Sequence, residues 1–99
     1  MKFKAKYLAT ARQDRATIKS YLDQYSTNAA KRLFDKIRHR IELAKENPYM
    51  YEAYKRRPQF RRIVVDDYLV FYKIDEESKI IEVHHILHGM IDIEQSSIK

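Results

Sequence analysis

The chain has 99 residues, of which 44% are hydrophobic and 34% are charged, with one glycine, two prolines and no cysteine. This length and composition exclude a multidomain enzyme, a low-complexity chain and a disulfide scaffold, and they predict one globular domain over residues 1–99. The formal net charge is +6 at pH 7, and it is uneven: residues 1–62 carry 17 Lys and Arg against 6 Asp and Glu, whereas residues 63–99 carry 3 against 8. Such a basic region is typical of proteins that meet polyanions or acidic partners.

The first elements along the chain are a strand and two helices. Residues 2–7 alternate lysine with apolar residues, which predicts a half-buried strand. Apolar residues at helical spacing predict a helix from about Ala9 to Tyr25, with Thr10 as its N-cap. Ser26-Thr27-Asn28 breaks this helix and offers a new cap, and a second helix is predicted after it, as far as Asn47-Pro48. The short break between them predicts an antiparallel helix hairpin.

Three strands are predicted in the second half of the chain. Residues 61–65, 68–74 and 80–87 are rich in β-branched and aromatic side chains, and two short acidic turns separate them. We expect an antiparallel three-stranded meander with the apolar middle strand at its centre. The predicted fold class is α+β, with an N-terminal strand, a helix hairpin and the meander, and with the helices packed on one face of a single sheet.

A basic connector between the second helix and the meander is the strongest candidate binding surface. It holds five cations and no acid between residues 55 and 62, with tyrosines just before them. Such a run indicates contact with nucleic acid or an acidic partner, with the aromatic rings as stacking surfaces. The predicted binding residues are Lys55, Arg56, Arg57, Arg61, Arg62, Tyr51 and Tyr54.

Three histidines near the end of the last strand raise the question of a metal site. Because neighbours on a strand point to opposite faces, His85 is predicted to lie away from His84 and His88, so we expect neither a metal nor a cofactor. The same parity places His85 in the core as a hydrogen-bonded residue and puts His84 and His88 together on the other face, beside Glu82.

The order of elements, together with four short motifs, resembles the RelE/ParE superfamily of type II toxins. The motifs are Ala16-x-Ile18-x-x-Tyr21-Leu22, Asn47-Pro48, Tyr68-Leu69-Val70-Phe71-Tyr72-Lys73-Ile74 and Ile86-Leu87-His88-Gly89-x-x-Asp92. The resemblance implies a growth-arresting toxin of a type II toxin–antitoxin system, which its antitoxin neutralises in a hetero-oligomer. It allows two targets: DNA gyrase for ParE-like members, and mRNA in the ribosome for RelE-like members.

The sequence favours the ParE-like target by a small margin. RelE-like nucleases carry an arginine early in the central strand, where this chain has Leu69, and no Tyr, His or Arg follows Gly89. If the chain were a RelE-like, metal-independent endoribonuclease, its catalytic residues would be His88, Arg62 and Arg61. A third possibility is an inactive toxin-fold interaction protein. Without a signal peptide or an apolar span in the sequence, we expect a cytoplasmic protein that does not contact membranes.

Overall fold

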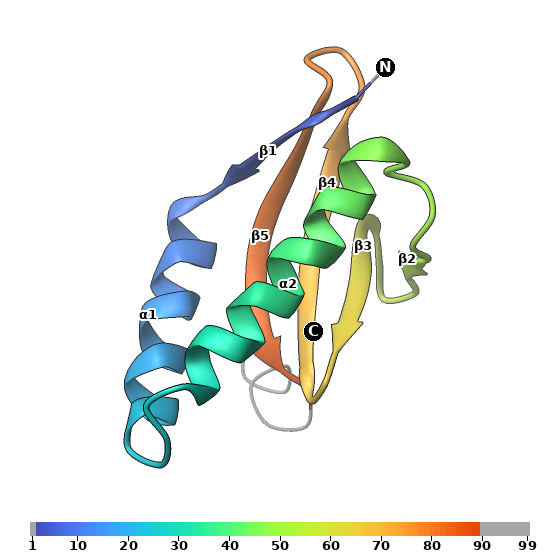
Figure 1. Ribbon diagram of the computed structural model, residues 1–99. Helices are drawn as coiled ribbons and strands as arrows, with labels where there is room; N and C mark the ends of the chain where they lie inside the picture. Colours follow the sequence, from blue (N-terminus) through green and yellow to red (C-terminus); the bar gives the residue numbers. More distant parts are fainter. Residues whose placement is uncertain (1, 90–99) are drawn as a thin grey trace.

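The computed structural model describes residues 2–89, which form two helices and a five-stranded sheet (Figure 1). In the sheet the strands lie in the order β1-β5-β4-β3-β2, so the apolar β4 is central, as predicted. The first strand is parallel to β5 and the other pairs are antiparallel. The elements in chain order are β1 (Lys4–Tyr7), α1 (Ala9–Asp23), α2 (Ala29–Glu46), β2 (Ala53–Tyr54), β3 (Arg57–Val65), β4 (Tyr68–Asp75) and β5 (Ile80–His88).

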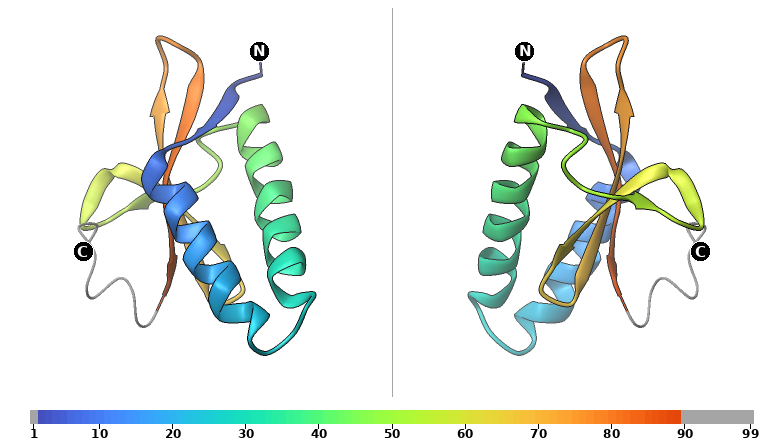
Figure 2. Two further views of the ribbon diagram at one scale, coloured as in Figure 1. Left: turned by 90° about the vertical axis from the view of Figure 1, so that its left-hand side faces the viewer. Right: turned by 90° about the vertical axis from the view of Figure 1, so that its right-hand side faces the viewer.

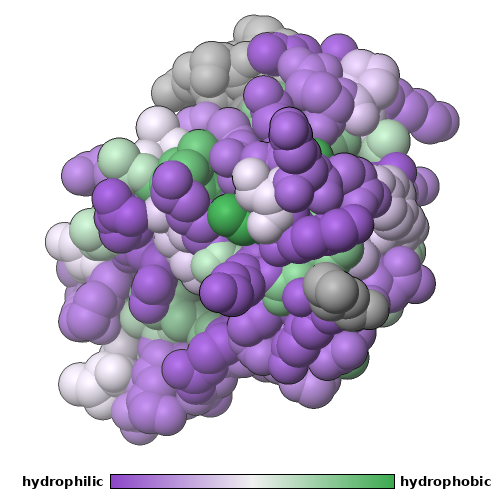
Figure 3. Space-filling view, turned by 90° about the horizontal axis from the view of Figure 1, so that it is seen from above, coloured by the Kyte–Doolittle hydropathy of each residue, from purple (hydrophilic) through white to green (hydrophobic). Residues whose placement is uncertain are grey.

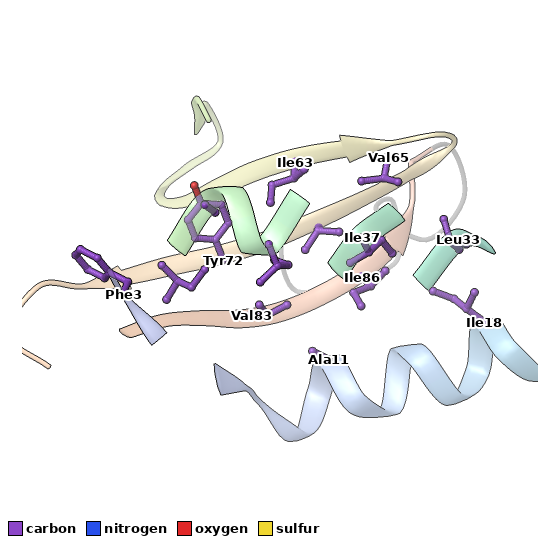
Figure 4. Close-up of a cluster of buried hydrophobic side chains, with 14 residues drawn as sticks. Phe3, Ala11, Ile18, Leu33, Ile37, Ile63, Val65, Tyr72, Val83 and Ile86 are labelled. Carbon is purple, nitrogen blue, oxygen red and sulfur yellow. The ribbon is translucent and has the colours of Figure 1, made fainter. Parts of the chain in front are cut away.

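Both helices cover the same face of the sheet, which confirms the predicted α+β architecture (Figure 2). The apolar stripe of α2 is buried against inward-facing residues of β3, β4 and β5. Figure 4 shows Ile37 of α2 and Ile86 of β5 among these side chains, with Ala11 and Ile18 contributed by α1. Burial of this apolar surface is the main source of stability in a chain without disulfides. Within residues 2–89, neither helix is long and apolar enough to cross a membrane.

Helix α1 closes the edge of β5 where β1 ends. Because β1 pairs with β5 only as far as Val83, the backbone groups that follow need other partners. Thr10 Oγ1 donates a 2.6 Å hydrogen bond to the carbonyl of His84, and the Asp14 carboxylate accepts a 3.0 Å bond from the Ile86 N–H. The prediction that Thr10 caps α1 is therefore wrong: Leu8 occupies the N-cap position, and the Thr10 hydroxyl bonds to the sheet.

A β-bulge in β5 reverses the side-chain parity of its last residues. Phe71 pairs with His85 but the next residue, Tyr72, pairs with Val83, so β5 has one extra residue at this point. Ile81, Val83 and Ile86 consequently face the helices, whereas Leu87 packs in a cluster on the opposite face. A strict period of two had predicted Leu87 beside Val83 and His88 beside His84, and the bulge makes both predictions wrong.

The basic connector is a hairpin and not a loop, in contrast to the sequence expectation. Strand β2 pairs with the first part of β3, which begins four residues earlier than predicted. In Figure 2 this hairpin curls away from α2, toward the face of the sheet that the helices leave open. There Tyr54, Phe60, Phe71 and Leu87 form a second, smaller apolar cluster. We call this side of the sheet the open face.

Candidate nucleic-acid and partner interface

The basic hairpin, residues 52–62, carries the cations that the sequence singled out. Lys55 and Arg56 form its exposed two-residue turn. Tyr54 before the turn and Phe60 after it are both buried in the cluster on the open face, so apolar packing holds the hairpin in place. The turn therefore presents two adjacent cations to solvent from an anchored base. Hydrophilic side chains cover most of the surface in the view from above, with small hydrophobic areas between them (Figure 3).

The two arginines in the middle of β3 point to opposite faces, as neighbours on a strand do. The guanidinium of Arg61 lies on the helix side, where it donates a 2.6 Å bond to the Tyr51 carbonyl and lies 4.9 Å from the centre of the Tyr49 ring. Arg62 lies on the open face and forms a 2.7 Å ion pair with Glu52. The hydrogen bond of Arg61 thus holds the segment before β2 in place. Of these two arginines, only Arg62 is directed toward the open face.

The two tyrosines that were predicted to stack on bases already pack against other aromatic rings. Tyr54 is only 7% exposed and meets Phe71 edge to face at 5.1 Å. Tyr51 packs edge to face on Tyr72 at 6.5 Å, and the buried Tyr72 hydroxyl donates a 2.5 Å bond to the Pro48 carbonyl. These contacts shape the hairpin and leave little ring surface for a nucleic-acid base.

His88 lies on the helix side of the sheet, away from Arg62. It pairs across the strands with Tyr68, whose ring centre is 5.4 Å from its own, and the two line a cleft with Leu22 of α1. Arg61 shares this side of the sheet, but it lies on β3 among the tyrosines. The structure therefore does not bring His88, Arg61 and Arg62 into one site.

Sequence reasoning missed a different cluster on the open face. The Phe60 ring has three titratable neighbours: the Lys73 Nζ at 4.9 Å, the His84 ring at 5.1 Å and the Arg57 guanidinium at 5.7 Å from its centre. Burial lowers the pKa of His84, and the charge of Lys73 adds to this, while the contact with Glu82 at 3.4 Å opposes it. Lys73 is the one charged residue in the apolar run of β4, and this was the signal available in the sequence. The predicted neighbour of His84, Glu82, is confirmed, but His88 lies on the other face because of the bulge, which leaves no mark in the sequence.

A groove on the helix side is the second candidate surface. It has a volume of about 460 Å³ and runs between β1 and the two helices. Its walls include Tyr7 and Phe34, and the Arg15 guanidinium lies 5.7 and 5.1 Å from the centres of these two rings. Cations at its rim outnumber acids, with Lys31, Arg38 and Lys45 beside Asp35 and Glu42. An apolar groove with a basic rim is suited to an acidic, amphipathic segment.

Two aromatic side chains stand exposed near the end of α1. Tyr21 and Tyr25 are 54% and 70% exposed, and their rings pack edge to face at 5.3 Å. Exposed tyrosines are enriched at protein–protein contacts because they bring a large apolar area together with a polar group. Among residues 2–89, no group of three or more His, Asp or Glu side chains is placed to hold a metal ion.

A family model and a solved structure are similar to this chain. The family model described as the ParE toxin of the type II toxin–antitoxin system parDE matches residues 5–93. Among solved structures, a chain of the toxin–antitoxin complex RelBE2 from Mycobacterium tuberculosis has a similar fold, with a TM-score of 0.61 and 14% sequence identity over 89% of this chain and 99% of that chain. No curated protein matches this sequence.

Proposed function

The chain belongs to the ParE toxin family of type II toxin–antitoxin systems, and we propose that it arrests growth by binding DNA gyrase. The match of the ParE model to residues 5–93, nearly the whole chain, is the observation that carries this proposal. We further propose that it acts in the cytoplasm, where gyrase is found, and that an antitoxin holds it inactive until the antitoxin is lost.

The geometry supports a toxin that acts by binding. A nuclease built on His88 would need a cation beside it, but Arg62 lies on the other face of the sheet and Arg61 is bonded to the Tyr51 carbonyl. A binding toxin has no such requirement. We propose Tyr21 and Tyr25, exposed near the end of α1, as its contact residues; the cationic turn of the basic hairpin lies at the opposite edge of the sheet.

A supercoiling assay with purified gyrase tests this proposal. Relaxed plasmid, gyrase and ATP are incubated with increasing amounts of the chain, and we expect supercoiling to be inhibited or cleaved DNA to accumulate. The double variant Tyr21→Ala, Tyr25→Ala should weaken the effect about tenfold or more, because two exposed aromatic contacts are lost. Arg32→Gln, a charge change on the exposed surface of α2, is the matched control. Normal supercoiling at a large excess of folded protein would contradict the proposal.

Cleavage of ribosome-bound mRNA is the second candidate, because Arg62 and His84 both lie on the open face. In that case toeprinting of a translated message should reveal cuts at the ribosome, and His84→Ala should abolish them while leaving the fold intact. A chain that neither inhibits gyrase nor cuts mRNA would be an inactive member of the fold that retains only its partner.

The antitoxin is proposed to occupy the groove between β1 and the helices. Apolar anchors would enter between Tyr7 and Phe34, and acidic side chains would meet Arg15 and Lys45 at the rim. The complex is then a hetero-oligomer held partly by charge, and its affinity should fall as salt is raised. Titration of the purified complex at low and high ionic strength tests this, and an affinity independent of salt would contradict it.

A further inference from the structure

A cleft beside α1 adjoins the proposed gyrase contact. It lies between α1, the turn that joins β3 to β4, the first residue of β4 and the last residue of β5, and its volume is about 480 Å³. Its walls are Thr17, Ile18, Tyr21, Leu22, Asp67, Tyr68 and His88. Tyr21 is 54% exposed and belongs both to these walls and to the proposed contact. The cleft and the contact residues on α1 therefore form one continuous surface.

The walls of this cleft are mainly apolar and aromatic. Ile18 is buried and Leu22 is half-buried, so α1 supplies a hydrocarbon wall. The rings of Tyr68 and His88 pair across the strands, with their planes at 81° and their centres 5.4 Å apart. This contact fixes the Tyr68 ring in the opposite wall. Such walls favour an occupant that brings apolar or aromatic-stacking atoms with little bound water.

Asp67 adds a negative charge to the cleft of a basic molecule. The chain has a net charge of +6, but Asp67 is the only Asp, Glu, Lys or Arg among the seven wall residues. It is exposed and forms no ion pair within residues 2–89, whereas the carboxylate of its neighbour Asp66 pairs with Lys36 at 3.0 Å. The carbonyl of Asp67 accepts the Gly89 N–H at 2.9 Å, which holds the turn beside the cleft. Charge complementarity therefore calls for a cationic occupant.

We propose that this cleft receives an arginine side chain of the protein that the toxin binds, an inference that rests on the proposed function. A guanidinium is planar and weakly hydrated, so it can stack on the rings of Tyr21 and Tyr68 while it donates two hydrogen bonds to the Asp67 carboxylate. Arginine is also enriched among the residues that contribute most to protein–protein binding.

Other occupants fit this cleft less well. A lysine ammonium is a compact, strongly hydrated charge without a planar surface, so it gains less from the aromatic walls. An apolar side chain would cover the Asp67 carboxylate without pairing it, and desolvation of an unpaired charge is costly. The chain itself shows the stacking geometry elsewhere, because the Arg15 guanidinium lies 5.7 and 5.1 Å from the ring centres of Tyr7 and Phe34.

Binding of purified gyrase to the immobilised chain, measured by surface plasmon resonance, tests the role of Asp67. Asp67→Asn keeps the shape of the side chain and removes its charge, and we expect it to weaken binding about tenfold or more. Asp66→Asn is the matched control, because it removes the same charge one position away, from a carboxylate that pairs with Lys36. Asparagine also tolerates the left-handed backbone of this position, where φ is 54°. The control should bind nearly as the native chain does, and equal losses in the two variants would show diffuse attraction and overturn the proposal.

A titration of the isotope-labelled chain with N-acetyl-arginine amide, followed by NMR, tests the cleft without gyrase. We expect saturable shifts at Leu22 and Tyr68 with a dissociation constant of about millimolar, typical of so small a ligand, and we expect Asp67→Asn to abolish them. N-acetyl-lysine amide should bind more weakly. Equal shifts with N-acetyl-leucine amide would show an apolar cleft and overturn the proposal, as would the absence of shifts with the arginine amide.

The two measurements separate this inference from the proposed function. If the native chain binds gyrase and Asp67→Asn binds it as tightly, the inference fails and the gyrase proposal stands. If the native chain does not bind gyrase, the proposed function fails, and the titration alone decides whether the cleft takes an arginine. Circular dichroism establishes that both aspartate variants are folded.

Discussion

The carboxylate of Asp14 lies 3.1 Å from Nδ1 of His85 and joins α1 to the bulge in β5. The same oxygen accepts the Ile86 N–H at 3.0 Å, so a single side chain serves two donors where β1 no longer covers the strand. This contact connects residues 71 positions apart and fixes α1 against the edge of the sheet. The orientation of α1, and with it of Tyr21, depends on it.

Replacement of Asp14 should destabilise the fold. Asp14→Ala leaves the partly buried Ile86 N–H without an acceptor, and we expect the free energy of unfolding to fall by about 1–3 kcal/mol. Asp14→Asn keeps an acceptor oxygen and should cost less. Urea denaturation followed by circular dichroism measures both. Asp23→Ala, which breaks only the exposed ion pair with Lys19, is the control and should change the free energy of unfolding by less than about 1 kcal/mol. Equal losses of stability in Asp14→Ala and Asp23→Ala would contradict the role of Asp14 in joining α1 to β5.

The buried Tyr72 hydroxyl should matter for stability and for the response to alkali. Tyr72→Phe removes the donor to the Pro48 carbonyl and should cost about 1–3 kcal/mol in a urea titration. Burial raises the pKa of Tyr72 to about 12, above its ordinary value of 10.0. The folded state therefore holds this proton more tightly than the unfolded state, and stability is lost as the pH rises from 10 toward 12. The Phe variant should lose less stability over this range, and an identical alkaline profile would contradict the assignment.

His84 should make the fold sensitive to mild acid. Its pKa is lowered by burial and by Lys73, so between that lowered value and 6.5 the unfolded chain binds more protons than the folded one. Stability contributed by neutral His84 is present above pH 6.5 and declines as the pH falls below it. Chemical denaturation at a series of pH values should show this decline in the native chain and a weaker one in His84→Gln. A steeper decline in the variant would be the contrary result.

His88 should be dispensable for killing if the chain acts on gyrase. The side chain lies on the helix side of the sheet and away from Arg62, so no nuclease centre is lost in His88→Ala. Induction of this variant should arrest growth nearly as strongly as the native chain at equal protein level, measured by colony counts and immunoblotting. Loss of killing in a variant that is folded and still bound by its antitoxin would show that His88 takes part directly.

Most of the fold was predictable because its signals are local. The apolar repeat of α2 and the apolar run of β4 specify one helix face and one central strand, and both predictions are confirmed. Two features depended on tertiary contacts instead. The bulge at His84 and His85 lies where α1 replaces β1 as the neighbour of β5. The pairing of Ala53–Tyr54 with β3 follows from the burial of Tyr54 and Phe60.

The candidate sites were harder to predict than the fold for the same reason. The predicted catalytic set grouped Arg61 and Arg62 with His88, but neighbours on a strand point to opposite faces, so only Arg62 lies on the open face. The parity of β5 changes at the bulge, so His84 lies on the open face and His88 does not. The cation run was visible in the sequence, whereas the neighbours of Phe60 come from three strands. Only the assembled sheet brings Arg57, Lys73 and His84 together.

The most direct test of the gyrase proposal is induction of this chain alone in a bacterial host, with pulse labelling of DNA and protein synthesis in the minutes that follow. Co-expression of the antitoxin is the control and should restore growth. If gyrase is the target, DNA synthesis falls first, a DNA-damage response follows, and messages remain intact on the ribosome. If protein synthesis falls first and cut messages accumulate, gyrase is not the target and the toxin acts as a ribosome-dependent nuclease.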